Sequence, residues 1–217
     1  MKFNKIIPVL DVLNKFTSRA SEINDIRVLA NEVERVLEEV IDVEYTGLYL
    51  FDVTDQKLKL YFARGFTEEE RLEAERTALQ RHPGHVFTTG QILYVPDTEK
   101  DNPAMSLDSQ RSFRVRSRLT IPVFNAEKVV GVFSISSAES NRFTEEHIAV
   151  ISFLGNLAGS VYGRIMNQRE LLRLTLIERD CDRTRLEAIS RENSERKKVE
   201  HALKNTERMT RMIIDTA

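Results

Sequence analysis

The histidines and the cysteine are the residues of this chain most suited to catalysis or metal binding. Their spacing argues against both. None of the four histidines stands in a context typical of a nucleophile–base dyad or triad. His82 and His85 form a close pair, but no third metal ligand lies near them, so we interpret them as exposed residues of a turn. The single cysteine, Cys181, excludes an intramolecular disulfide. We therefore expect no enzyme activity, no metal and no cofactor.

Polar side chains suited to binding a small molecule lie in two apolar segments, residues 119–124 and 129–135. The polar residues 125–128 separate these segments, which predicts a central β-hairpin. The two-residue period of a strand places large apolar residues on one face and a few polar groups on the other. We predict a ligand site on the polar face, formed by Arg118, Thr120, Ser134 and Ser136, and closed by Asp97, Arg111, Phe113 and Arg114. Alternatively, the serines bond only to backbone and Arg118 pairs with a surface carboxylate.

The elements that must position this site follow from periodicity. Residues 4–16 and 23–43 have helical apolar stripes, and residues 45–53 and 57–62 are typical of strands. Thr67 can cap a charged helix from Glu68 to about Gln80, which His82-Pro83-Gly84 is expected to stop. Residues 97–116 predict a long loop over the polar face of the sheet.

From Glu145 onward one helix of up to about 70 residues is predicted, with Thr144 as its N-cap. A helix of this length needs a partner, and the charge-mixed residues 166–217 are typical of a coiled coil. We expect a parallel homodimer in which Cys181 meets its own mate. The predicted interface comprises Ile151, Leu154, Ala158, Val161, Ile165, Leu172, Cys181, Leu186 and Ile189. A second, shifted stripe consists of Leu174, Ile177, Cys181, Thr184 and Ala188, which suggests a change of register.

Gly155, Gly159 and Gly163 form a separate row on this helix, at a spacing of four residues. Glycine inside a helix is unfavourable, so another backbone must approach this face closely. Either the sheet and N-terminal helix of the same domain or a partner subunit would satisfy this requirement.

Composition excludes several classes of function. The chain has 217 residues, of which 41% are hydrophobic and 30% charged, and its formal net charge is −2. A near-neutral balance gives no electrostatic case for binding nucleic acid or an anionic membrane. The N-terminus lacks the apolar core of a signal peptide, and the uncharged residues 148–163 are few and contain three glycines. We expect a cytoplasmic protein that does not span a membrane.

Several short motifs occur in an order that resembles a known family. They are residues 82–91 (HPGHVFTTGQ), residues 94–97 (YVPD), Ser117-x-Leu119-x-Ile121-Pro122-Val123, Val130-Gly131-Val132 and Phe143-Thr144-Glu145-Glu146. Together they closely resemble the GAF domain, a small-molecule sensor module of signalling proteins. The resemblance implies an α+β fold: a GAF-like central antiparallel sheet with helices on one face and a loop-roofed pocket on the other. To this the sequence adds a long C-terminal coiled-coil helix.

The resemblance also implies a domain organisation and a role. Residues 1–165 would form a GAF sensor domain, with N-terminal helices over 4–43, sheet and loops over 45–143, and the start of the long helix over 144–165. Residues 166–217 resemble the coiled-coil linker that leads into PAS or histidine-kinase modules of bacterial sensors. We expect a fragment of a larger bacterial signalling protein, such as a sensor histidine kinase of a two-component system. It would be a non-catalytic sensory and dimerisation module.

The family includes four alternative roles. The chain would be a dimerising spacer without a ligand if the polar face were collapsed. Cyclic-nucleotide-binding GAF domains are matched at Asn141-Arg142-Phe143, but His147 and Ile148 stand where an acidic pair is expected. Methionine sulfoxide reduction and covalent bilin binding use cysteines of the domain, and residues 1–165 contain none.

Overall fold

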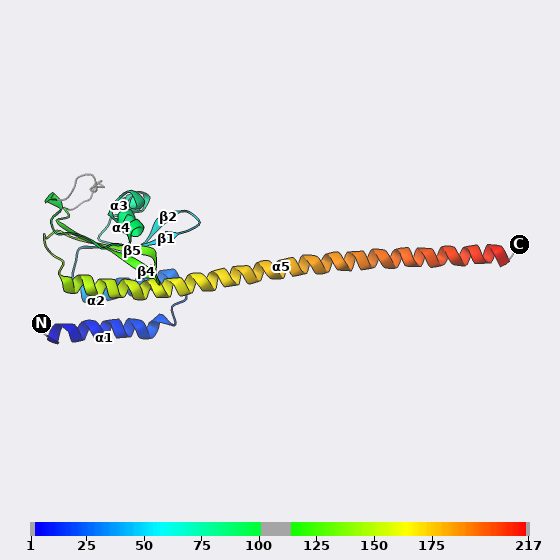
Figure 1. Cartoon of the computed structure of the whole chain (residues 1–217), viewed down its shortest axis with the longest axis horizontal. Coiled ribbons are helices and arrows are strands. Elements are labelled where there is room, and N and C mark those ends of the chain that lie inside the picture. Colours follow the sequence, from blue (N-terminus) through cyan, green and yellow to red (C-terminus); the bar gives the residue numbers. More distant parts are fainter. Residues whose placement is uncertain (1–2, 101–113, 216–217) are drawn as a thin grey trace. The chain divides into compact units, whose positions relative to one another are not determined.

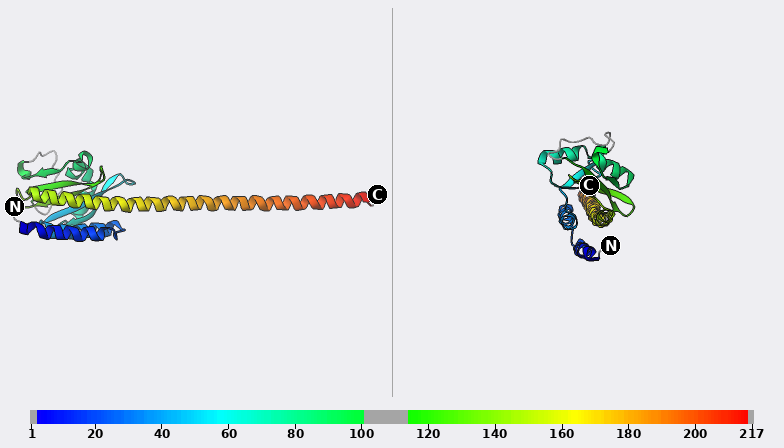
Figure 2. Two further views of the ribbon diagram at one scale, coloured as in Figure 1. Left: turned by 60° about the horizontal axis from the view of Figure 1, so that its bottom comes forward. Right: turned by 90° about the vertical axis from the view of Figure 1, so that its left-hand side faces the viewer.

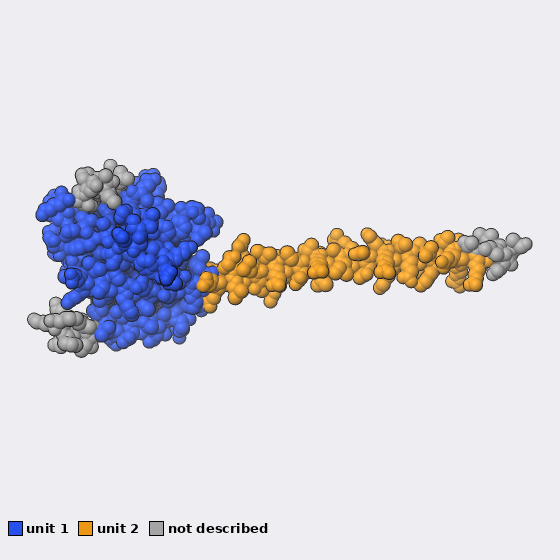
Figure 3. Space-filling model, in the orientation of Figure 1, with its two compact units in different colours: residues 1–166 blue, residues 167–217 orange. Residues whose placement is uncertain are grey.

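The computed structural model describes residues 3–100 and 114–215, with side chains over 9–100, 114–209 and 211. The chain divides into two compact units, residues 1–166 and residues 167–217 (Figure 3). The first unit contains the whole sheet, and the second is formed by the C-terminal part of one helix.

The first unit is built on a five-stranded antiparallel sheet with the order β2-β1-β5-β4-β3. The predicted hairpin is confirmed as β4 and β5, which lie beside each other inside the sheet. Their nearly continuous apolar character is explained by helices that cover both faces. The strands are β1 (Tyr45–Asp52), β2 (Lys57–Arg64), β3 (Leu93–Val95), β4 (Ser117–Asn125) and β5 (Lys128–Ser137).

One face of the sheet packs on helices from both ends of the unit. These are α1 (Phe3–Ala20), α2 (Ile26–Val40) and the beginning of α5 (Glu145–Asp215), all on the same side of the sheet in Figures 1 and 2. As the two-residue period predicts, Leu119, Ile121 and Val123 of β4 point into this core with Phe133 and Ile135 of β5. This is the main hydrophobic core of the first unit.

The opposite face of the sheet is also covered by helices. They are α3 (Glu68–Arg76), the 3-10 turn η1 (Ala78–Gln80) and α4 (His82–Thr89), above the sheet in Figure 1. Between them and the sheet lies a smaller core that includes Tyr49, Leu60, Val86 and Val132. The expectation of a loop roof is therefore wrong for this part of the face.

The prediction that residues 82–84 form a turn was also wrong. Pro83 lies in the first turn of α4, where its missing N–H costs nothing and its fixed φ suits a helix. Gly84 packs on the preceding turn, because a Cβ built on it would lie 2.0 Å from the carbonyl oxygen of Leu79. Gly90 ends the helix in a left-handed conformation with φ of 67°.

Side chains at the helix starts confirm the predicted caps. Thr67 accepts from the amide of Glu70, whose carboxylate accepts from the amide of Thr67, so both ends of this capping box are made. Thr144 and His147 form the same reciprocal pair at α5, with the His147 Nδ1 atom in place of a carboxylate. Burial, together with the nearby Arg142, lowers the pKa of the His147 imidazole, and Glu146 opposes the shift.

The glycine row of α5 lies against the domain's own sheet rather than against a partner. A Cβ built on Gly159 would lie 2.0 Å from the carbonyl oxygen of Phe124, and one on Gly163 would lie 2.2 Å from the Asn125 side chain. Gly155 lies over Phe133 and the carbonyl of Pro122. The row therefore lets α5 approach the backbone of β4 closely.

Helix α5 contains an 18-residue window that is long and apolar enough to cross a membrane by length and composition alone. Half of this window is buried inside the protein, where residues such as Ile151 and Leu154 fill the core. Packing against the sheet therefore accounts for the apolar character of this segment.

The edge strand β2 is tied to α3 by side chains. The amide of Leu60 donates to the Glu75 carboxylate at 2.9 Å, and the Arg71 guanidinium donates to the carbonyl oxygen of Leu60 at 3.5 Å. Because Arg71 and Glu75 are one helical turn apart, both reach the same backbone unit of the strand.

Candidate functional site

A buried polar contact of the first unit joins Arg118 of β4 to His82 at the start of α4. The Arg118 Nη1 atom lies 2.8 Å from the His82 Nδ1 atom, and both residues are buried, at 6% and 2% exposure. A guanidinium has only donors, so the His82 Nδ1 atom accepts and the proton of a neutral imidazole is on Nε2. The pair thus places a buried cation between the sheet and α4.

A row of small side chains crosses the same face of the sheet next to this pair. Thr120 is opposite Ser134, Ser134 is opposite Gly47, and Gly47 is opposite Ala63. Arg118 is opposite Ser136 in the next row. The four polar residues predicted to share a face are therefore direct cross-strand neighbours. They form two pairs, Arg118 with Ser136 and Thr120 with Ser134.

Thr120 is the polar residue of this row whose environment points most clearly to a missing partner. Its side chain is fully buried, and its hydroxyl makes no hydrogen bond within the described part of the chain. A buried hydroxyl without a partner is unfavourable by about 1–3 kcal/mol. The structure therefore leaves a desolvated hydroxyl on the face that also carries Arg118.

Asp97 does not close this site. Its carboxylate binds the guanidinium of Arg116 at 3.2 Å, and the same guanidinium contacts Glu99 at 3.3 Å. Arg114 also pairs with Glu99, rather than with the polar face. Arg111 and Phe113 lie outside the described residues. The carboxylate predicted to face the ligand is thus held by a different arginine.

Asp97 instead lines a small hollow beside β3. The hollow has a volume of about 280 Å³ and is lined by Leu93, Tyr94, Val95, Pro96, Asp97, Lys100 and Asn141. It is distinct from the Arg118–His82 pair, which does not contribute to its lining.

Sequence reasoning missed His82, which it placed on the exposed surface with His85. Only His85 is exposed. The signal that could have identified His82 is its position directly before a proline, since Pro at the start of a helix places the preceding side chain at the helix N-terminus. Glu70 in α3 and Arg81, the residue directly before α4, are also buried polar residues.

Part of the predicted dimer interface is corrected by the structure. Ile151, Leu154, Ala158, Val161 and Ile165 are at most 7% exposed and belong to the core of their own domain. An apolar stripe shows that a helix face is buried but not which surface covers it. The remaining predicted interface residues, Leu172, Cys181, Leu186 and Ile189, are exposed on the second unit.

The residues that match the cyclic-nucleotide pattern have structural roles. Asn141 has a φ of 56° and donates its amide to the carbonyl of Pro96, and Arg142 donates to the carbonyl of Asp42. Phe143 is buried edge-to-face against Tyr94. These three residues form the turn that leads into α5. Among the described residues no cluster of three or more potential metal ligands occurs.

The family model that describes the GAF domain matches residues 24–161 of this chain. This segment is more than half of the chain and contains the sheet, α3, α4 and most of the buried part of α5. The chain belongs to the GAF family. GAF domains are sensory and regulatory modules of signalling proteins, and most are not catalytic.

Solved structures share the GAF fold with this chain. The GAF domain of a phosphoenolpyruvate-protein phosphotransferase from Acinetobacter aligns with a TM-score of 0.59 and 18% identity, over 77% of this chain and 97% of its own. Residues 122 to 287 of a methyl-accepting chemotaxis protein align with a TM-score of 0.58 and 19% identity, over 69% of this chain and 96% of that structure. The free methionine-R-sulfoxide reductase from Neisseria meningitidis aligns with a TM-score of 0.61 and 20% identity, over 77% and 95%.

Proposed function

We propose that this GAF domain binds a small molecule on the face of the sheet covered by α3 and α4, and that the bound state biases a homodimer formed through α5. The buried Thr120 hydroxyl without a hydrogen-bond partner, on the same face as Arg118, is the observation that carries the proposal. A ligand that accepts from this hydroxyl would remove the cost of its desolvation.

The chemistry of the face favours a ligand with a carboxylate or a similar oxyanion. A guanidinium binds such groups through parallel N–H donors, and burial strengthens each of these bonds. The contact with His82 keeps the Arg118 side chain in place. The row of Thr120, Ser134, Gly47 and Ala63 carries small side chains, which suits a small ligand.

The mechanism would be non-catalytic. A ligand shifts the equilibrium between two arrangements of a dimer only by its differential affinity for them. The long helix would carry this bias to an output module, such as a PAS or kinase domain, in a bacterial cytoplasmic signalling protein. Sulfoxide reduction is disfavoured because residues 1–166 contain no cysteine.

Thermal unfolding of the purified chain in the presence of small metabolites tests this proposal. The panel comprises mono- and dicarboxylates, amino acids, phosphate esters and cyclic nucleotides. A ligand at 100 times its dissociation constant stabilises the folded state by about 2.7 kcal/mol, so the midpoint rises measurably. Thr120→Val should abolish the rise for the active compound, whereas Thr77→Val, outside the site, should leave it unchanged. A flat response to the whole panel would favour the alternative, a dimerising spacer without a ligand.

A further inference from the structure

The second unit, residues 167–217, is a helix whose described side chains are nowhere buried. Its large apolar side chains include Leu174, Ile177, Leu186 and Ile189, each between 46% and 67% exposed. An isolated helix gains little stability from its backbone alone and depends on packing of its apolar face. A partner is therefore needed, and the sequence of this helix contains information about which partner fits.

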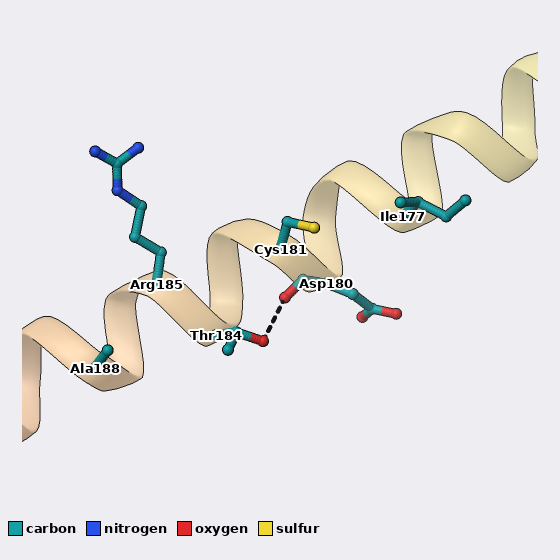
Figure 4. A pocket seen from close by; sticks show the side chains of 6 residues that line it. All are labelled: Ile177, Asp180, Cys181, Thr184, Arg185 and Ala188. Carbon is teal, nitrogen blue, oxygen red and sulfur yellow. Dashed lines mark hydrogen bonds between the residues drawn. The ribbon is translucent and has the colours of Figure 1, made fainter.

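Five residues form a continuous line on this helix, which we call the 174–188 seam: Leu174, Ile177, Cys181, Thr184 and Ala188. Their alternating spacing of three and four residues is that of the a and d positions of a coiled coil. Most of them line an open hollow of about 550 Å³, together with Asp180 and Arg185 (Figure 4). Small side chains in the centre of the seam leave space for the side chains of a facing helix.

The polar member of the seam is compatible with burial. The Thr184 hydroxyl donates to the carbonyl oxygen of Asp180 at 2.9 Å within the same helix (Figure 4). Its hydrogen-bonding requirement is therefore met before any partner arrives, and its methyl group remains available for packing. Burying Thr184 in an interface would leave no unsatisfied donor.

Charges beside the seam identify the partner as a second copy of this chain in parallel orientation. In a parallel pair, the residue before an a position faces the residue after the following d position of the other helix. This places Arg173 opposite Glu178 of the other copy, and Asp180 opposite Arg185 of the other copy. Both contacts join opposite charges, and the two-fold symmetry makes each of them twice.

Other arrangements are less favourable. An antiparallel pair centred on the Cys181–Ile177 layer places Glu178 near Glu178 and Asp180 near Asp180, so like charges face each other. Extending the parallel seam beyond Ala188 places Glu187 opposite Glu192 and puts Glu195 and Lys198 at core positions. The seam is therefore confined to residues 174–188.

We propose that the 174–188 seam is the parallel homodimer contact of this chain, with Cys181 facing its own mate and four ion pairs fixing the register. This inference rests on the dimer in the proposed function and specifies its register. In this register the interface is formed by the shifted stripe, which is the 174–188 seam. Leu172 and Leu186 of the other predicted stripe lie on the outer surface of the coiled coil.

Charge reversal with a matched control tests the register. Arg185→Glu places a carboxylate opposite Asp180 of the other copy, whereas Arg179→Glu makes the same change of charge on the outer surface. Sedimentation of the full reduced chain should show a dimer whose dissociation constant rises about tenfold in Arg185→Glu and hardly changes in Arg179→Glu. Asp180→Arg combined with Arg185→Asp should restore the wild-type constant. If the dimer is too tight for its dissociation constant to be measured, the thermal unfolding midpoints of the variants are compared at one fixed protein concentration instead.

Cross-linking provides a second measurement. Diamide takes two electrons and two protons from a pair of facing Cys181 thiols and leaves one S–S bond, so wild type should become a covalent dimer and Cys181→Ser should not. A monomeric mass for the reduced chain, equal effects of the two charge reversals, or a dimer that never cross-links would each overturn the register. None of these results depends on ligand binding, so a failed register with a positive thermal response would leave the ligand site standing.

Discussion

Gly159 of α5 and Phe124 of β4 are in backbone contact, because a Cβ on Gly159 would lie 2.0 Å from the Phe124 carbonyl oxygen. The contact involves backbone on the strand side, which a change of rotamer cannot move. Close approach at this point therefore requires glycine.

Gly159→Leu should destabilise the first unit by about 3 kcal/mol, because a large side chain must push α5 away from the sheet. Urea denaturation measures the change. Ser160→Leu adds the same side chain to the exposed side of the helix and should change stability by less than about 0.5 kcal/mol. Equal stability of the two variants would show that α5 does not pack on β4 as described.

Arg118 and His82 should be energetically coupled. Arg118→Met leaves the buried His82 Nδ1 atom without its donor, and His82→Phe leaves a buried guanidinium without this acceptor, so each should destabilise by at least about 1–3 kcal/mol. The double variant should be less destabilised than the sum, with a coupling of about 1 kcal/mol or more in a double-mutant cycle. Additive losses would show that the two side chains act independently.

Thr120→Val should stabilise the protein in the absence of ligand by up to about 1 kcal/mol, because it replaces an unpaired buried hydroxyl by a methyl group of similar size. Thr77→Val is the matched control. The Thr77 hydroxyl is also buried but donates to the carbonyl of Glu73 at 2.8 Å, so its loss should destabilise by about 1 kcal/mol. A destabilised Thr120→Val variant would contradict the assignment of an unsatisfied hydroxyl.

Stability should fall on acidification partly through His147. Because the pKa of His147 is lowered in the folded state, the unfolded chain binds the proton more readily at this site. The contribution of His147 to the free energy of unfolding is therefore complete above the ordinary histidine pKa of about 6.5, and it is lost as the pH falls below that value. Protonation also removes the Nδ1 acceptor that caps α5.

His147→Gln keeps an acceptor at this helix position but does not titrate, so its unfolding midpoint should fall less between pH 7.5 and pH 5.5 than that of wild type. His85→Gln, on the exposed side of α4, should retain the wild-type slope. Identical slopes for wild type and His147→Gln would exclude His147 as a source of the pH dependence.

Periodicity predicted the elements whose determinants are local. The hairpin of β4 and β5, the faces of its side chains and the cap at Thr67 follow from alternation and capping chemistry, and all three are confirmed. The cross-strand pairs Arg118–Ser136 and Thr120–Ser134 follow from the same alternation once the turn at 125–128 fixes the register.

The errors arose where a residue has two structural uses. Pro83 and Gly84 are typical of a helix end. Proline is also favourable in the first turn of a helix, however, and Gly84 is required by a close contact with Leu79. The predicted exposure of His82 is wrong for the same reason, because an exposed turn and a buried helix start have similar sequences. The stripe from Ile151 to Ile165 predicts an interface with a partner, but it belongs to the core of its own domain, because periodicity cannot distinguish an intramolecular core from an interface.

The contact of Glu75 with the Leu60 amide has a consequence for self-association. An edge strand presents free amides that another chain could use to extend the sheet, which is a common route to aggregation. At β2 the carboxylate of Glu75 takes the Leu60 amide, and the Arg71 guanidinium takes its carbonyl oxygen. A second sheet approaching this edge must displace two charged side chains, so α3 protects the GAF domain against strand addition at β2.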